Sequence, residues 1–435
     1  MIRKFFAIAM VIIMAIGLLA GCGQSSNKSN ESSQANNSNQ SENKVTTITM
    51  WGSWSGDQVK QIQGQLDAFN KTHPNIQVQY VVQQNLEQKL LTALAGGEVP
   101  DVLLWDRFQT ALYAPKGALA PIDEYVKKDN VNLKDFYSEA VREMSYDGKL
   151  YGLPMAVDNR SLFYNKKLFQ EVGIQNPPTT WAELEQDAKK LTVWKDGKLA
   201  RAGLALDDVG LFNMWILQAG GHMLTPDGTK TAFNSQAGLD VLNFWHKLIY
   251  DDKVYVNGFT QGLAQGEDPF VTGKVAMKFN GPWALADYKK YGKDLDFGIV
   301  PPPAGPNGDK GTRMGGFGLA IASKSAHKDQ AWEFIKWWTT IPENGVNFAK
   351  ISGWIPANMK AANDPYFTND PYYKAFIEAM NFAKIRPPVP GYSDVEGKAL
   401  IPDLQLFLLN KMTAEQALKD AQQKGDTILQ QNRQQ

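Results

Sequence analysis

The side chains that most often do chemistry are sparse in this sequence or stand far apart. The four histidines are His73, His222, His246 and His327, and no two of them have the short spacing of a metal-ligand pair. The motifs G-x-S-x-G, H-E-x-x-H, G-x-x-x-x-G-K-S/T and G-x-G-x-x-G, which mark common hydrolase, metalloprotease and nucleotide sites, do not occur. We therefore expect no enzyme activity, no metal and no cofactor. A pair of carboxylates of the glycosidase kind stays open as an alternative, because the chain has 45 Asp and Glu residues.

Tryptophan is the residue type that stands out. The chain has 12 Trp and 15 Tyr but only 4 His. Broad aromatic faces suit the recognition of flat, weakly polar ligands better than they suit metal or imidazole chemistry. The 45 Lys and Arg balance the 45 Asp and Glu, so the composition argues against the strongly basic surface of a nucleic-acid-binding protein.

The elements that must position these side chains alternate between strand and helix. Residues 45–51, 75–82 and 102–105 have the composition or the period of strands, and apolar residues recur at helical spacing over 59–69 and 86–94. This order predicts an α/β fold with helices on both faces of the sheet, and the length of 435 residues predicts two to three domains. Ligands of such sheets lie beyond the carboxyl ends of the strands, which are followed here by Trp51 to Ser53 and by Asp106 and Arg107. An amphipathic helix is predicted to close the chain over 413–430.

The first 44 residues predict export and anchoring rather than a fold. Arg3 and Lys4 precede an uncharged apolar run that ends at Ala20 and is shorter than the roughly 20 residues of a membrane-spanning helix. The run leads into Leu19-Ala20-Gly21-Cys22, which resembles the bacterial lipobox, and Cys22 is the single cysteine of the chain. Residues 1–21 are thus a predicted signal peptide and Cys22 a predicted lipid attachment site, where two acyl chains would anchor the protein stably. Residues 22–44, rich in Ser, Asn and Gln, are a predicted disordered tether.

Five segments further along resemble one known family, in the order that the family has. They are residues 98–108, 150–165, 276–283, 315–321 and 351–357, and the third of them ends in Asn280-Gly-Pro-Trp283. The chain resembles the extracellular solute-binding proteins of family 1, of the maltodextrin-binding type that serves carbohydrate ABC importers. The resemblance extends from Val45 to about Leu429.

The resemblance implies a two-lobe periplasmic-binding-protein fold with interlobe crossovers. The ligand would lie in the cleft between the two α/β lobes, which close on it by hinge motion. Residues 45–157 and 280–316 would form the N-terminal lobe, and residues 158–279 and 317–435 the C-terminal lobe. The crossovers are then expected near Val157-Asp158, near Asn280 and near Gly316.

The family's ligand contacts also map onto this chain by resemblance. Trp283 is the leading candidate for stacking on a ligand, whereas Trp332, Trp337 and Trp338 lie on one predicted helix and are expected in the core. Asp158 stands where the maltodextrin type has a longer acid, which is a departure from the family pattern. The expected ligand contacts are Trp51, Ser53, Asp106, Arg107, Asp158, Asn159, Trp215, Trp283, Phe317, Trp354, Arg386 and Tyr392.

The function expected from this resemblance is the capture of a short, neutral oligosaccharide and its delivery to an ABC permease. The protein would be a monomer, exported and lipid-anchored to the outer face of the cytoplasmic membrane, with no nucleic-acid partner. One alternative is a receptor for a phosphorylated polyol such as glycerol-3-phosphate, held by some of Arg107, Arg160, Arg313 and Arg386. A second alternative, from another class, is a surface-anchored carbohydrate-active enzyme.

Overall fold

The structure is a computed structural model that describes residues 45–261 and 268–433. The predicted signal peptide (1–21), Cys22 and the predicted tether (22–44) lie outside the described residues. Among the described residues, no helix combines the length and the apolar character needed to cross a membrane.

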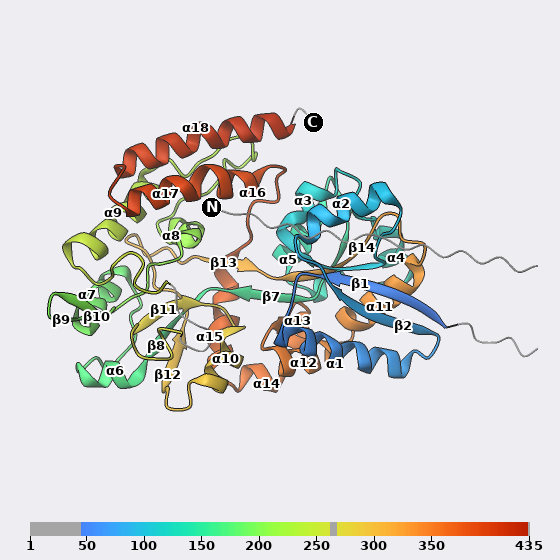
Figure 1. The fold of residues 1–435 in the computed structure, drawn as a ribbon, viewed down its shortest axis with the longest axis horizontal. Helices are drawn as coiled ribbons and strands as arrows, with labels where there is room; N and C mark the ends of the chain where they lie inside the picture. Colours follow the sequence, from blue (N-terminus) through green and yellow to red (C-terminus); the bar gives the residue numbers. More distant parts are fainter. Residues whose placement is uncertain (1–44, 262–267, 434–435) are drawn as a thin grey trace, which may run out of the picture. The chain divides into compact units, whose positions relative to one another are not determined.

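A five-stranded sheet forms the centre of one lobe, which we call the N-terminal lobe (Figure 1). The strand order is β2-β1-β3-β14-β6, in which β1 runs parallel to β2 and β3, and β14 runs antiparallel to β3 and β6. The strands are β1 (Thr46–Gly52), β2 (Ile76–Val82), β3 (Val102–Asp106), β6 (Gly152–Pro154) and β14 (Phe317–Ile321). The helices are α1 (Asp57–Thr72), α2 (Leu86–Gly96), α3 (Thr110–Tyr113), α4 (Asp123–Lys128), α5 (Ser138–Glu143), α11 (Lys328–Thr340) and α12 (Pro342–Ser352).

The strands and helices predicted for the first part of this lobe are confirmed. α1 buries Ile62, Leu66 and Phe69 along one stripe, which is the stripe that helical spacing predicts. Val102 to Trp105 of β3 are all buried, as expected for a central strand. Trp332 and Trp338 of α11 are 4% and 1% exposed, so their predicted place in the core is confirmed, whereas Trp337 is only partly buried.

A three-stranded antiparallel sheet, of order β11-β8-β12, lies at the centre of the C-terminal lobe. Its strands are β8 (Ser161–Asn165), β11 (Met277–Asn280) and β12 (Phe297–Val300). Helices near it include α8 (Phe212–Gln218), α9 (Gln236–His246) and α10 (Ala284–Tyr291), and the helix predicted to close the chain is confirmed as α18 (Ala414–Arg433). The remaining elements of this lobe are α6 (Lys166–Glu171), α7 (Trp181–Leu191), β9 (Val193–Lys195), β10 (Lys198–Arg201), α14 (Pro365–Thr368), α15 (Pro371–Ala379), α16 (Tyr392–Asp394) and α17 (Ile401–Leu408). The short helix α13 (Met359–Ala362) packs against α12 of the N-terminal lobe.

A small third sheet carries the chain between the lobes. It has the order β15-β7-β13-β16 and consists of β7 (Ala156–Asn159), β13 (Thr312–Gly315), β15 (Ile355–Pro356) and β16 (Ala383–Lys384). β7 connects β6 to β8, β13 connects β12 to β14, and β15 connects α12 to α13. The chain therefore crosses between the lobes three times, and Figure 1 shows β7 and β13 side by side between the two larger sheets.

Two of the predicted lobe boundaries are wrong. The crossover expected at Val157-Asp158 lies in β7, but residues 280–316 contain β12, which pairs with β8 of the C-terminal lobe. Residues 317–352 contain β14, α11 and α12 and belong to the N-terminal lobe, because β14 pairs with β3. A crossover does lie beside Gly316, because β13 ends at Gly315, but it returns the chain to the N-terminal lobe instead of leaving it. The chain leaves that lobe again after β15, and no crossover lies at Asn280. Apolar runs predict that a segment is a strand, but they do not say which distant strand it joins.

Candidate functional site

A cavity of about 270 Å³, which we call the tryptophan cavity, lies in the C-terminal lobe. Three tryptophans line it: Trp215 lies on α8, Trp245 lies on α9, and Trp283 immediately precedes α10. β11 contributes its last three residues, Lys278 to Asn280. The segment before α8 contributes two acids, Asp207 and Asp208. The lining residues used below are Arg160, Asp207, Asp208, Trp215, Trp245, Lys278, Phe279, Asn280 and Trp283.

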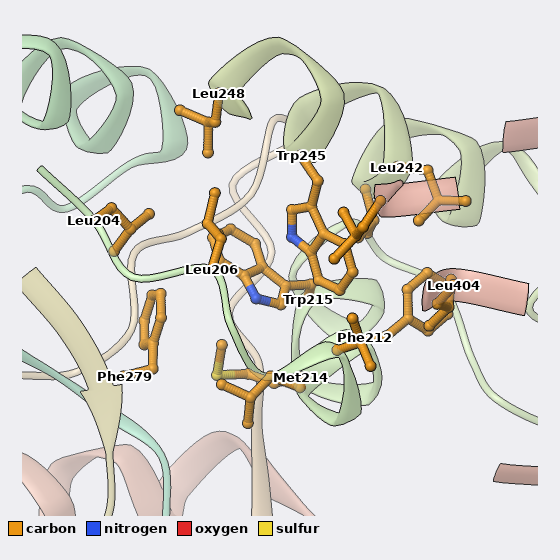
Figure 2. Close-up of a cluster of buried hydrophobic side chains, with 14 of the residues drawn as sticks. Leu204, Leu206, Phe212, Met214, Trp215, Leu242, Trp245, Leu248, Phe279 and Leu404 are labelled. Carbon is orange, nitrogen blue, oxygen red and sulfur yellow. The ribbon is translucent and has the colours of Figure 1, made fainter. Parts of the chain in front are cut away.

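Three aromatic side chains make the apolar wall of this cavity. Trp215 and Trp245 meet edge to face with ring centroids 6.2 Å apart, and Phe279 meets Trp215 in the same manner at 5.2 Å (Figure 2). Trp215 is 1% exposed and Trp245 3% exposed, so both also pack into the core of the lobe. The Nε1 of Trp245 is buried without a hydrogen-bond partner among the described residues, so it is a donor that a ligand oxygen could satisfy.

The two cations at this cavity are already paired within the protein. Arg160 donates to the Asp158 carboxylate at 2.7 Å, and its guanidinium lies over the Trp283 ring, 4.4 Å from the centroid. Lys278 lies 3.4 Å from the Asp268 carboxylate. Asp207 and Asp208 are exposed and also line the cavity. Two cations and two anions thus line it, and their formal charges sum to zero.

Trp283 also belongs to an aromatic row that continues into the N-terminal lobe. It lies 5.4 Å from Trp354, which stacks on Trp54 at 5.4 Å, and Trp54 meets Phe317 edge to face at 5.0 Å. Trp283 and Phe317 are partly buried, whereas Trp354 and Trp54 are buried. The structure thus brings the predicted residues Trp283, Trp354 and Phe317 together, with Trp54 between them as an unpredicted member.

The two predicted residues at the end of β1, Trp51 and Ser53, do not line the tryptophan cavity. Trp51 is partly buried against the core of the N-terminal lobe, and Ser53 is exposed just after the strand. The structure gives no contact between either side chain and the tryptophan cavity.

Arg107 lies inside the protein, which differs from the ligand contact that the family resemblance implies. Its side chain is 0% exposed. The guanidinium donates to Glu143 Oε2 at 3.1 Å, to the Gly315 carbonyl at 2.6 Å and to the Ala156 carbonyl. Arg107 therefore joins the end of β3 to the crossing strands β7 and β13, and all of these partners are protein atoms. This placement corrects the expected role of Arg107 from binding to positioning.

Asp106 lies beside Arg107 but has a different environment. It is partly buried at the end of β3. Burial raises the pKa of Asp106 to about 6, although the nearby Arg386 and Arg107 guanidinium groups act in the opposite direction. The negative charge of Asp158 also raises this pKa, so the two predicted acids are close enough to interact electrostatically. Of the two acids predicted to contact the ligand, Asp158 is paired with Arg160, whereas Asp106 forms no ion pair among the described residues.

Asn159 and Arg386 are held by protein partners, whereas the Tyr392 hydroxyl is buried without a hydrogen-bond partner among the described residues. Asn159 is buried and donates through Nδ2 to the Phe376 carbonyl at 2.7 Å. Arg386 donates to Glu396 at 2.6 Å and lies over the Phe108 ring of the N-terminal lobe, 4.4 Å from its centroid. Tyr392 is 2% exposed, and burial raises its pKa well above the ordinary value.

Sequence reasoning missed several side chains at the site. Trp245 has the helical spacing of a core residue, and Asp207, Asp208 and Lys278 stand in no recognisable motif. Asn280 could have been predicted, because it begins the Asn-Gly-Pro-Trp segment that contains Trp283. Within residues 45–261 and 268–433, no three His, Cys, Asp or Glu side chains come together in a way that could hold a metal ion.

The fold and the site together define a class of protein, namely a two-lobed α/β protein with a cavity suited to binding a ligand. Three crossing strands connect the lobes, and the cavity offers aromatic faces and hydrogen-bonding groups. Residues 53–344 match the family of bacterial extracellular solute-binding proteins, and this match covers more than half of the chain. The chain belongs to this family, whose members are exported binding proteins of transporters and not enzymes.

Individual relatives are similar over most of their length. The maltotriose-binding protein of Pyrococcus abyssi is 29% identical over 358 residues, which are 80% of this chain and 75% of the relative. The maltodextrin-binding protein MdxE of Bacillus subtilis is 25% identical over 414 residues, covering 91% of this chain and 90% of the relative. Among solved structures, CpMnBP1 with mannotriose bound has a TM-score of 0.76 and 32% identity, and the match covers 88% of this chain and 100% of that one.

Proposed function

We propose that this protein captures an oligosaccharide for an ABC importer and delivers it to the membrane permease, with the tryptophan cavity holding a neutral sugar ring. The observation that carries the proposal is the convergence of Trp215, Trp245 and Trp283 on one cavity with Asn280 and two exposed acids. A pyranose ring has an apolar C–H face that packs on aromatic rings, and its hydroxyl groups bond to carboxylates and amides. The relatives whose names specify maltotriose, maltodextrin and mannotriose support the same class of ligand.

The charge balance of the cavity favours a sugar over a phosphorylated polyol. A phosphate would have to take Arg160 from Asp158 or Lys278 from Asp268, and the exposed Asp207 and Asp208 would repel it. A neutral hydroxyl can bind without breaking either of these ion pairs. Glycerol-3-phosphate therefore fits this cavity less well than an uncharged sugar does.

Titration calorimetry with a panel of maltose-, mannose- and cellobiose-series oligosaccharides and glycerol-3-phosphate tests the proposal. We expect tight binding of at least one oligosaccharide, a shift of tryptophan fluorescence, and no new reducing ends after long incubation. Saturating ligand at about 100 times its Kd should add about 2.7 kcal/mol of stability. Release of shorter sugars would show an enzyme, and tight binding of glycerol-3-phosphate alone would show the polyol-phosphate receptor.

Asp106 predicts a pH dependence of binding. Because its pKa is raised to about 6, the carboxylate predominates above pH 6 and is lost as the pH falls below that value. If this carboxylate accepts hydrogen bonds from sugar hydroxyls, affinity should fall below pH 6, by up to about tenfold for each pH unit. Calorimetry between pH 5 and 8 should show this fall in the wild type and a flat, weaker profile in Asp106→Asn. The exposed Asp57→Asn variant should keep the wild-type profile, and a wild-type affinity that does not change with pH would contradict a role for the Asp106 carboxylate.

We further propose that Cys22 carries the lipid anchor of a monomeric receptor on the outer face of the cytoplasmic membrane. The lipobox-like segment and the polar tether after it support this proposal. Cys22→Ala should leave the protein in the soluble or culture fraction, or unprocessed, with unchanged sugar affinity in calorimetry. Membrane fractionation with lipid labelling measures this, and a correctly cleaved Cys22→Ala protein that still sediments with membranes would contradict it.

A further inference from the structure

A second cavity, of about 550 Å³, lies on the other side of α8, and we call it the arginine cavity. Trp215 of α8 lines the tryptophan cavity, whereas Asn213 and Leu217 line the arginine cavity. Residues two apart on a helix point in widely different directions, so one short helix separates the two cavities. The apolar side of the arginine cavity is the segment from Pro387 to Val389. Tyr392 also lines the cavity, and its hydroxyl is buried without a hydrogen-bond partner among the described residues.

The arginine cavity has an excess of positive charge. Arg142, Arg313, Lys384 and Arg386 line it, against the two acids Glu139 and Asp227. Three of the four cations have partners, since Arg142 and Lys384 pair with Glu139, and Arg386 pairs with Glu396. Arg313 forms no ion pair in the part of the chain that the structure describes, and its Nε is buried without a hydrogen-bond partner there.

The two acids that raise the pKa of Arg313 are already bonded to other side chains. Burial, followed by the neighbouring Arg386 and Arg160, lowers the pKa of Arg313 to about 10. Glu396 and Asp158 raise this pKa, but Glu396 is bonded to Arg386 at 2.6 Å and Asp158 to Arg160 at 2.7 Å. Asp106 acts on Arg313 from a distance, but it does not line this cavity.

Asn213 adds an unused acceptor to the same cavity. It is 5% exposed, and its Nδ2 donates to Glu396 Oε1 at 2.7 Å. This bond fixes the orientation of the amide, because a carbonyl oxygen in that place would face a carboxylate. The Oδ1 is then left buried with no partner among the described residues. The cavity thus offers a cationic donor at Arg313 and a neutral acceptor at Asn213.

We propose that the arginine cavity binds a carboxylate carried on a hydroxylated carbon skeleton, that is, a sugar acid. The carboxylate would accept from Arg313, and a hydroxyl of the same ring would donate to Asn213 Oδ1. The sugar acid is either a uronic acid residue of the captured oligosaccharide or a free uronate. This inference rests on the proposed function, since it extends the recognition of a sugar to an acidic one. Chloride or sulfate fits less well because neither has a hydroxyl for Asn213.

Titration calorimetry of the mature protein with four probes tests the proposal. They are a neutral disaccharide, an aldobiouronic acid of the same linkage, and free glucuronate and galacturonate. We expect the aldobiouronic acid to bind at least about tenfold more tightly than its neutral counterpart, the gain of a charge-assisted hydrogen bond. Arg313→Gln should remove this preference and leave the affinity for the neutral disaccharide within twofold. Arg142→Gln, an equal change of charge at an exposed position of the same cavity, should change both affinities less than threefold.

Two further measurements make the result decisive. Arg313→Lys keeps the charge but lacks the Nε donor, so it should give an intermediate affinity for the acid, and thermal melts should show that both Arg313 variants fold. Binding of glucuronate or galacturonate to protein already saturated with the neutral sugar identifies a free uronate, whereas binding of the aldobiouronic acid alone identifies an acidic oligosaccharide. Equal affinity for acidic and neutral sugars, or equal losses of both in Arg313→Gln, would overturn the inference. Absence of binding to every sugar, acidic or neutral, would instead overturn the proposed function.

Discussion

Replacing Arg107 with alanine is expected to lower the free energy of unfolding by about 3–5 kcal/mol, the usual cost of breaking a buried ion pair. The change removes the partner of Glu143, which is 2% exposed, and leaves the Gly315 and Ala156 carbonyls without their donor. Burial raises the pKa of Glu143 to about 7 even with Arg107 present, and loss of the guanidinium should raise it further. Chemical denaturation of the ligand-free protein measures the change.

Arg142→Ala is the matched control for this prediction. Arg142 is also an arginine paired with a glutamate, Glu139 at 2.7 Å, but its side chain is 56% exposed. An exposed pair contributes about 0–1 kcal/mol, so this variant should unfold almost as the wild type does. If Arg107→Ala were as stable as Arg142→Ala but had lost its ligand affinity, Arg107 would be a binding residue, as the family resemblance implies.

The position of Arg107 also gives it a specific structural role. It joins β3 to β7 and β13 beside Gly316, whose φ of 128° lies where residues with side chains are strained. A Cβ at Gly316 would meet the Arg107 guanidinium at 2.6 Å. The buried Arg107 side chain thus holds together β7 and β13, two of the strands that connect the lobes.

Replacing Trp283 with alanine should weaken sugar binding about 30-fold or more, while the ligand-free protein melts at nearly the wild-type temperature. Loss of a central aromatic anchor costs about 2 kcal/mol or more in binding. Trp283 is only partly buried, and it presents its ring to Arg160 on one side and to Trp354 on another. Calorimetry of binding and differential scanning calorimetry of the free protein give the two readings.

Trp194→Ala is the control for the loss of a tryptophan. Trp194 is 43% exposed on β9 and does not line the tryptophan cavity, so its variant should bind sugar normally. The competing role for Trp283 is a core residue, for which truncation costs about 3–5 kcal/mol of stability. A Trp283→Ala protein that melts far earlier but binds sugar normally when folded would show that the ring belongs to the core.

The elements that could be predicted from the sequence are those specified by local periodicity. β1, β3, α1, α2 and α18 follow from runs and stripes within fewer than about 20 neighbouring residues, since the period of apolar residues reports directly which side of an element is buried. The class of function followed from the missing catalytic motifs, the many tryptophans and the five family-like segments. The Asn280-Gly-Pro-Trp283 segment also identified the one aromatic that both lines the cavity and stays partly open.

Tertiary structure decided the features that depend on which distant segments meet. The pairing of β14 with β3 and of β12 with β8 set the lobe boundaries, and no local pattern distinguishes these partners. Asp106 and Arg107 are neighbours in sequence, but the guanidinium turned inward to Glu143 while the carboxylate was left without an ion pair. Trp245 has the spacing of a core residue and still reaches the cavity. Whether a polar or aromatic side chain binds a ligand or holds the fold depends on the partners that folding brings to it, because a satisfied donor or a covered ring has little left to offer a ligand.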